Sequence, residues 1–225
     1  MNQLLLLCLL LATAYAATID DDSFRPIIEK VNSIKTTWKA DPNFPSDITV
    51  SSIKRLLGLK KSVHKLPPKQ ENDISDTPIP EEFDARKQWP ECPTISQIAD
   101  QSNCGSCWAV AAATAFSDRL CIASKGKLTT PLSAEELLSC CDSCGDGCNG
   151  GYISAAWDYF AEEGIATGGA YNSSVGCQPY PLPSCEHHTE GSLPACSSLP
   201  EYDTPRCEKK CTNSQYKVPF KQDHH

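Results

Sequence analysis

Two stretches in the first quarter of the chain have hydrophobic residues at helical spacing. In the first, five apolar residues fall on one face when the chain is wound as a helix. These residues are Ile27, Ile28, Val31, Ile34 and Trp38. The second stretch is a short apolar turn within residues 53–57. Residues 41–45 lie between the two and contain two prolines, so they are expected to interrupt the helix.

Three more helices are predicted further along the chain. Residues 108–122 are apolar almost all round and include five alanines, which indicates a buried central helix packed through small side chains. Residues 133–136 read Ser-Ala-Glu-Glu, a capping box that opens a helix toward the two leucines that follow. Residues 153–163 form a third predicted helix, which Gly164 ends. Residues 167–225 are rich in Pro, Gly, Ser and Cys and are expected to form loops.

The N-terminus has the pattern of a cleaved signal peptide. Residues 4–11 are an apolar run broken only by Cys8, and Ala14-Tyr15-Ala16 gives the small-x-small pattern of a cleavage site. A membrane anchor is the alternative, but the run is far shorter than the roughly 18 apolar residues needed to span a bilayer. We therefore expect residues 1–16 to be removed and no membrane association afterwards.

Charge divides the remaining chain into two parts. Residues 17–78 carry ten Lys/Arg and nine Asp/Glu, whereas residues 79–225 carry ten and nineteen. Residues 60–80 are polar and Pro-rich, which indicates an exposed linker that a protease can cut. The net charge is −8, and the sequence shows no Lys/Arg cluster that forms a face or stripe. Nucleic acid is therefore not expected as a partner.

Cysteine usage points to an oxidising compartment. Fourteen cysteines in 225 residues are rare in a reducing cytosol and common in secreted or endomembrane proteins. Removal of the signal peptide takes Cys8 away and leaves thirteen. An odd number implies one free thiol or one intermolecular bridge.

The strongest local motif is the run from Gln101 to Trp108, which reads Gln-Ser-Asn-Cys-Gly-Ser-Cys-Trp. It places Cys107 at the start of the predicted central helix, where the helix N-terminus favours a thiolate. The side-chain amide of Gln101 and the backbone N–H of Cys107 are candidate donors to an oxyanion. Gly105 is expected to let the chain turn tightly before the helix. A thioredoxin-like redox pair and a pair of structural cysteines are the alternatives.

These residues, with others along the chain, resemble the papain family of cysteine proteases and within it cathepsin B-like precursors. The nucleophile motif Cys-Gly-Ser-Cys-Trp matches in full. Two stretches also resemble the short propeptide of this family, which runs through the cleft in reverse and blocks it. The further matching stretches are residues 36–40, 53–58, 83–86, 88–90, 92–95, 117–119, 140–141, 144–152, 185–188 and 203–205.

The resemblance implies an α+β, papain-like fold. The chain would hold mainly the helical left domain with disulfide-rich loops, and the right β-barrel domain would be largely missing. Its parts would be a signal peptide at 1–16, a propeptide at 17–78 and the N-terminal part of the peptidase domain at 79–225. The catalytic His and Asn of the family lie roughly 130–150 residues after the Cys, beyond His225. We therefore predict that this 225-residue chain by itself has no significant peptidase activity, and we do not assign the base role to its last two histidines.

The resemblance also implies six disulfides that leave Cys107 free. A zinc site is the rival for residues 140, 141, 144 and 148, but disulfides are favoured in an oxidising compartment. No metal and no other cofactor are expected. The implied pairs are Cys92–Cys121, Cys104–Cys148, Cys140–Cys207, Cys141–Cys144, Cys177–Cys211 and Cys185–Cys196.

The same resemblance implies the substrate-binding residues. Gly150 and Gly151 would approach an extended substrate closely, with Tyr152 bordering the next pocket. His187 and His188 match an occluding loop, where they would bind the C-terminal carboxylate of a substrate and so give dipeptide release. Two solvated loop histidines are the alternative.

Further expectations concern single positions in the resemblance. Asp100 matches the partner that clasps His187, whereas Leu193 stands where the family has an arginine for a second clasp, so a looser loop is expected. Ser102 replaces a usual glycine and is expected to strain the backbone. Asn172 begins an N-glycosylation sequon, Asn-Ser-Ser.

The functional hypothesis is a cysteine-type peptidase of cathepsin B type. It would act as an endopeptidase and peptidyl-dipeptidase through a Cys thioester and be made as an autoinhibited zymogen in the secretory pathway, secreted or lysosomal. Expected partners are peptide and protein substrates, its own propeptide and cystatin-like inhibitors. The rivals are a non-catalytic decoy or inhibitor-binding module and a purely structural secreted scaffold.

Overall fold

The computed structural model describes residues 24–42, 44, 53–54, 56–61, 78–187 and 190–225. The predicted signal peptide, most of the predicted linker and His188 lie outside the described residues. The chain forms two compact units, Met1–Lys54 and Arg55–His225, and each is described by itself. The boundary falls inside the predicted propeptide, so the last part of that segment belongs to the second unit.

The first unit contains helix α1, Arg25–Ser33. It lies where the apolar spacing predicts a helix, but it ends before Trp38, because Ile34 is already extended. The Asn32 side chain exchanges two hydrogen bonds with the main chain of Ala40, at 2.7 and 2.8 Å. These bonds turn the chain back just after the helix, so the later apolar positions follow a loop and not a helical face.

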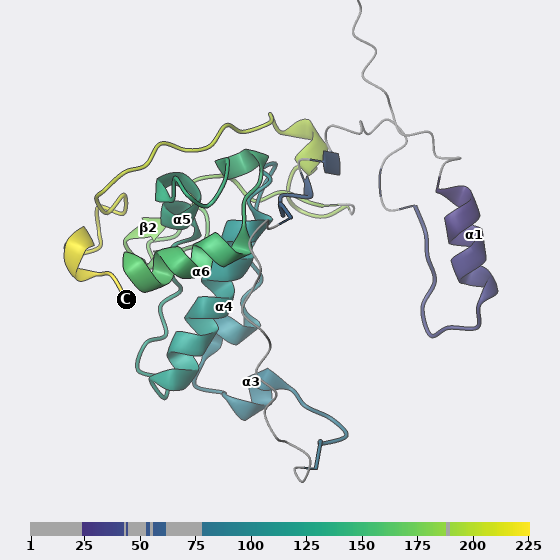
Figure 1. Cartoon of the computed structure of the whole chain (residues 1–225), viewed down its shortest axis with the longest axis horizontal. Helices are drawn as coiled ribbons and strands as arrows, with labels where there is room; N and C mark the ends of the chain where they lie inside the picture. The colour runs from purple at the N-terminus through teal and green to yellow at the C-terminus, as the bar shows by residue number, and fades with distance from the viewer. Residues whose placement is uncertain (1–23, 43, 45–52, 55, 62–77, 188–189) are drawn as a thin grey trace, which may run out of the picture. The chain divides into compact units, whose positions relative to one another are not determined.

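Three helices form the core of the second unit (Figure 1). Helix α4 spans Cys107–Ala123, α5 spans Ala134–Cys140 and α6 spans Ile153–Glu162. Helix α4 packs against both of the others. All three lie where the sequence predicts them, and Gly164 follows α6 with a positive φ of 75°. Burial along α4 is less complete than predicted.

The buried side chains of α4 form one stripe and not a full ring. Trp108, Ala112 and Cys121 are each at most 2% exposed, whereas Ala111 is exposed. The small residues of this stripe let α5 and α6 approach closely, with Leu137 and Phe160 in the same cluster.

The capping box at the start of α5 is only half formed. The Ser133 hydroxyl accepts a hydrogen bond from the Glu136 N–H at 3.0 Å, as predicted. The Glu136 side chain does not return to the Ser133 N–H, which instead donates to the Ala166 carbonyl at 2.8 Å. Glu136 turns away because Ala166 donates its own N–H to that carboxylate, also at 2.8 Å.

The remaining described structure is short elements and loops. The strands β1, Gly168–Gly169, and β2, Gln178–Pro179, pair in parallel as a two-stranded sheet. None of the helices in the described part of the chain has the length and apolar character that a bilayer crossing needs. The short helices are α3, Ala85–Gln88; η2, Pro93–Ser96; η3, Gly147–Asn149; η4, Cys196–Ser198; and η5, Phe220–Gln222.

Six disulfides cross-link the described residues of the second unit, and they are the six pairs that the resemblance implies. Cysteines 140, 141, 144 and 148 belong to three different bridges, so the rival zinc site is excluded there. The largest sequence separation is 67 residues, for Cys140–Cys207, and the smallest is 3, for Cys141–Cys144. Cys140–Cys207 joins the irregular segment 167–225 to the end of α5, and the Cys177–Cys211 and Cys185–Cys196 bridges close loops within that segment.

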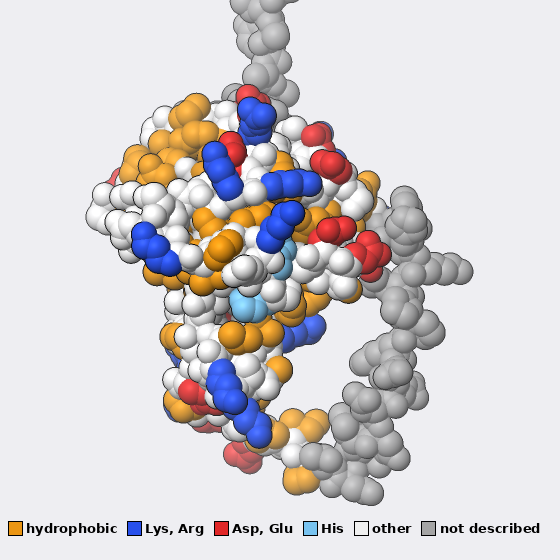
Figure 2. Space-filling model, turned by 90° about the vertical axis from the view of Figure 1, so that its left-hand side faces the viewer, with side chains coloured by type: hydrophobic (Ala, Val, Ile, Leu, Met, Phe, Trp, Pro, Cys, Tyr) orange, Lys and Arg blue, Asp and Glu red, His pale blue; other side chains and the backbone are white. Residues whose placement is uncertain are grey.

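Four lysines lie around one hollow of the second unit, which is a local group and not a basic face or stripe. Figure 2 shows Lys and Arg side chains gathered on this side among hydrophobic ones. The loop between residues 209 and 222 brings four lysines around an open hollow of about 500 Å³. Tyr216 donates its hydroxyl to Asp223, and the Phe220 ring stacks edge-on against His224. The clustered lysines are Lys209, Lys210, Lys217 and Lys221.

Candidate active site

Cys107 is the first residue of α4 and the one free cysteine among the described residues. Its side chain is half-buried. The loop before it is fastened to the chain at residue 148 by the Cys104–Cys148 disulfide and by a 2.8 Å hydrogen bond from the Gly105 N–H to the Cys148 carbonyl. The thiol therefore stands at a helix N-terminus on a rigid loop. Among the described residues no group hydrogen-bonds to this thiol.

The first backbone N–H groups of α4 lack hydrogen-bond acceptors among the described residues. Those of Cys107 and Trp108 have no hydrogen-bond partner among the residues that the structure describes. Ser106, the residue that precedes the helix, makes no side-chain cap. Unpaired N–H groups and the helix dipole both favour negative charge at this position.

Gln101 is held at both its side chain and its main chain. Its side-chain amide donates to the Cys104 carbonyl at 2.9 Å. Its own carbonyl accepts a 3.0 Å hydrogen bond from the hydroxyl of Tyr180. The second amide proton of Gln101 remains for another acceptor, as an oxyanion donor requires.

The chain bends at residues 103–105, just before the helix, and Ser102 precedes this bend. Ser102 has a φ of 59°, in the left-handed region, whereas Gly105 is not among the residues with positive φ. The expected strain at Ser102 is therefore present, and Gly105 lies in the expected bend without a positive φ. The Gly105 carbonyl is also closely approached by Gly58.

Gly150 and Gly151 form a wall beside α4. Gly150 has a φ of 101°, and its carbonyl accepts from the Asp146 N–H at 2.8 Å. A Cβ on Gly151 would come within 2.5 Å of the Trp108 ring, so only glycine fits there. Tyr152 donates its N–H to the Cys144 carbonyl at 2.7 Å. The two glycines thus give a backbone edge without side chains.

A segment of the predicted propeptide occupies this edge. Gly58 accepts a hydrogen bond from the Gly151 N–H at 2.8 Å, and Lys60 donates its N–H to the Gly151 carbonyl at 2.9 Å. Leu59 and Gly151 form a parallel bridge. A Cβ on Gly58 would overlap the Gly105 carbonyl and come within 3.1 Å of Cys107 Sγ. The chain therefore passes directly over the candidate nucleophile.

The loop closed by the Cys185–Cys196 disulfide is anchored to Asp100. One carboxylate oxygen of Asp100 lies 3.1 Å from His187 Nε2 and accepts from the Ser102 N–H at 2.7 Å. The other oxygen accepts from the Cys185 N–H at 3.0 Å. The expected Asp100–His187 clasp is formed, and Leu193 is 44% exposed. Because both cysteines are bridged, their sulfurs and His187 do not make a metal site.

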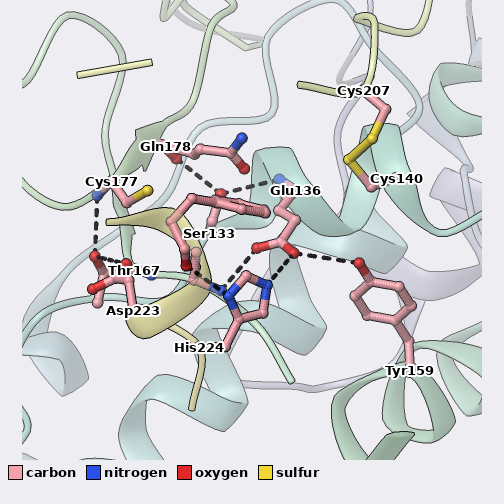
Figure 3. Close-up of polar contacts among 12 residues, drawn as sticks. Ser133, Glu136, Cys140, Tyr159, Thr167, Cys177, Gln178, Cys207, Asp223 and His224 are labelled. Carbon is pink, nitrogen blue, oxygen red and sulfur yellow. Dashed lines mark hydrogen bonds and ion pairs between the residues drawn. A yellow bond between two sulfur atoms is a disulfide. The ribbon is translucent and has the colours of Figure 1, made fainter. Parts of the chain in front are cut away.

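His224 lies in a separate polar cluster, drawn in Figure 3. Its Nε2 lies 2.8 Å from a carboxylate oxygen of buried Glu136, and its Nδ1 lies 2.9 Å from the Phe220 carbonyl. Nearby, Asp223 accepts from both the N–H and the hydroxyl of Thr167 at 2.7 Å. Both ring nitrogens of His224 are used, so this cluster fixes the chain end against α5 and offers no free imidazole.

Sequence reasoning missed Tyr180, which contacts both ends of the loop from Gln101 to Ser106. Its hydroxyl lies 2.7 Å from Ser106 Oγ as well as 3.0 Å from the Gln101 carbonyl. Burial raises the pKa of this phenol, so it stays protonated. Tyr180 is 79 residues from Gln101 and stands in a loop without periodicity, so no local pattern marks it.

Comparisons with known proteins agree with this geometry. Residues 79–224 match the model of the papain family cysteine protease domain, and residues 25–62 match that of the family C1 propeptide. Cathepsin B-like cysteine proteinase 4 of Caenorhabditis elegans is 48% identical over 204 residues, which are 88% of this chain and 60% of that protein. A cathepsin B-like cysteine proteinase of Schistosoma japonicum is 42% identical and covers 94% of this chain and 64% of its own length.

Among solved structures, procathepsin B S9 from Trypanosoma congolense matches with a TM-score of 0.67 and 38% identity, over 89% of this chain and 61% of its own. The chain thus spans less than two thirds of the length of these three relatives. The domain match covers well over half of the chain and includes the loop and helix that carry Cys107. The chain therefore belongs to the papain family of cysteine proteases.

Proposed function

We propose that the native protein containing this chain is a cysteine peptidase of cathepsin B type, made as an autoinhibited zymogen. Cys107 attacks the peptide carbonyl and forms a thioester, while the Gln101 amide and the Cys107 N–H stabilise the oxyanion. The observation that carries the proposal is the passage of residues 58–60 over Cys107, paired to Gly151. A segment held in this place excludes substrate until it is removed.

The proposed substrate specificity depends on two groups of residues, the Gly150–Tyr152 edge and the loop that carries His187. Gly150 and Gly151 pair with the main chain of an extended substrate, and Tyr152 borders the neighbouring pocket. His187 and His188 bind a substrate C-terminal carboxylate, which gives dipeptide release. Leu56, Gln101, Val110, His187 and Leu193 line an open hollow of about 590 Å³ on this side, which supports binding of substrate residues there. Cystatin-like inhibitors would compete for the same cleft.

The proposed location is the secretory pathway, secreted or lysosomal. Six disulfides in the described residues support an oxidising compartment. Asn172 is exposed, in keeping with use of its sequon for N-glycosylation.

The test is hydrolysis of a fluorogenic peptide by the native protein, before and after limited proteolysis at residues 60–80. We expect activity to appear only after cleavage and to be abolished by Cys107→Ser. A second substrate with a blocked C-terminus separates endopeptidase from dipeptidase activity. Absence of hydrolysis after cleavage, with retained binding of a cystatin, would favour the non-catalytic decoy.

A further inference from the structure

Ser106 occupies the N-cap of α4 but does not act as a cap. A serine in this position commonly accepts a hydrogen bond from the second or third N–H of the helix. Here Ser106 is fully buried, and its hydroxyl lies 2.7 Å from Tyr180 Oη instead. The N–H of Trp108, the natural partner of such a cap, has no acceptor among the described residues.

The direction of the two hydrogen bonds at Tyr180 follows from proton counting. A phenol has one proton, and Tyr180 donates it to the Gln101 carbonyl at 3.0 Å. The Ser106 hydroxyl must therefore donate to Tyr180 Oη. This bond holds the serine side chain in a rotamer that points toward the tyrosine, so its oxygen does not reach the helix N–H groups.

Tyr180 is itself firmly placed. It is 6% exposed and follows directly after β2, and its N–H donates to the Gly169 carbonyl at 2.9 Å. The Cys177–Cys211 disulfide closes the chain three residues earlier. A rigid phenol thus spans the loop that begins at Gln101 and ends at Cys107.

We propose that Tyr180 is a positioning residue for the candidate nucleophile: it draws the Ser106 hydroxyl away from the start of α4 and fixes the Gln101 main chain, so that the N–H groups of the helix terminus stay open to negative charge at Cys107. The inference rests on the proposed role of Cys107. Without the phenol hydroxyl, Ser106 is free to cap the open Trp108 N–H, which satisfies a donor next to the thiol and weakens the stabilisation of an anion.

The experiment follows alkylation of Cys107 by iodoacetamide in the intact 225-residue chain, as a function of pH. Because the other described cysteines are bridged, Cys107→Ser shows the background. Tyr180→Phe is expected to slow alkylation at pH 6–7 roughly two- to fivefold, the size of a helix-terminus interaction, and to move the pH midpoint upward. Tyr180→Phe with Ser106→Ala is expected to recover the rate, because no hydroxyl remains to cap the helix.

A double variant as slow as Tyr180→Phe would show that the tyrosine acts only through general packing, and it would overturn the proposal. Ser106→Ala alone keeps the helix terminus uncapped and is expected to react faster than Tyr180→Phe. A loss of Cys107 alkylation in Ser106→Ala also overturns the proposal. This measurement does not require the Tyr180→Phe variant to fold. Alkylation requires no peptide hydrolysis, so the result is independent of whether the chain is a peptidase.

Discussion

The backbone at Ser102 is the least favourable single-residue feature of the catalytic loop. Its φ of 59° costs roughly 1–2 kcal/mol for a residue with a Cβ. Its buried hydroxyl also has no hydrogen-bond partner among the described residues. The conformation persists because the Ser102 N–H is held by Asp100 at 2.7 Å.

We expect Ser102→Gly to raise the free energy of unfolding by about 1 kcal/mol, after the entropy that glycine gains in the unfolded chain is subtracted. Urea denaturation of the oxidised chain measures this. Ser102→Ala is the control, because it removes the hydroxyl and keeps the strained φ. If Ser102→Ala stabilises the chain as much as Ser102→Gly, the cause of the gain is removal of the unpaired buried hydroxyl and not relief of the strained φ.

The protonation of Glu135 makes the free energy of unfolding depend on pH. It is 6% exposed in α5, and burial raises its pKa from 4.5 to about 8, against a smaller opposing effect of a hydrogen bond with Ser139. The folded chain therefore binds a proton more tightly than the unfolded chain between pH 4.5 and 8. Stability falls as pH rises through this window and levels off above it.

Glu135→Gln should thus stabilise the chain at pH 8 by a few kcal/mol at most, at roughly 1.4 kcal/mol per pKa unit, and change little at pH 4.5. The measurement is the urea midpoint of both chains at several pH values. Glu162→Gln, an exposed change on α6, controls for net charge. A gain of equal size at pH 4.5 and pH 8 would contradict the burial argument.

The candidate site residues that the sequence pointed to are those with a local signature. Cys107 is the fourth residue of a five-residue motif, and Gln101 lies three residues before that motif begins. The bend expected at Gly105 is present, whereas the positive φ lies at Ser102, whose N–H bonds to Asp100. Tyr180 was not found because its partners lie 74 and 79 residues away.

At the scale of elements, helices α4, α5 and α6 follow from periodicity and caps, whereas the ends of elements follow from tertiary contacts. Helix α1 stops at Ser33 because Asn32 bonds to Ala40. The capping box of α5 is half formed because Glu136 bonds to Ala166 and lies beside His224. In both cases a side chain within a local pattern takes a partner outside that pattern.

The segment over Cys107 depends on the absence of a side chain at residue 58. We expect Gly58→Ala to prevent its pairing with Gly151, because the added Cβ overlaps the Gly105 carbonyl. Alkylation of Cys107 should then accelerate about tenfold, the effect of losing ~1.4 kcal/mol of contact. The matched control is Leu57→Ala, since Leu57 is 69% exposed. Equal rates in Gly58→Ala and the unchanged chain would mean that this segment does not shield the thiol.

At the scale of the whole molecule, the disulfides replace the regular structure that residues 167–225 lack. In the described part of this range the only strands are two residues long, and the helices are single turns. A chain with so little periodicity must be restricted in its unfolded state, and the restriction grows with the length of loop that a bridge closes. The spacing of cysteines shows that such a framework exists, but the pairing came from the family resemblance.

Loop-closure entropy predicts which disulfides contribute most to the free energy of unfolding. Replacing Cys140 and Cys207 by alanine opens a loop with a sequence separation of 67 residues, whereas replacing Cys141 and Cys144 opens one of 3. Loop-closure entropy gives losses of about 4 and about 2 kcal/mol at 25 °C. Cys141 and Cys144 are buried, and the other two are half-buried, so loss of packing works against this order. A larger urea-midpoint shift for the 140–207 pair would therefore isolate the unfolded-state effect, whereas the reverse order would assign the stabilisation to packing in the folded chain.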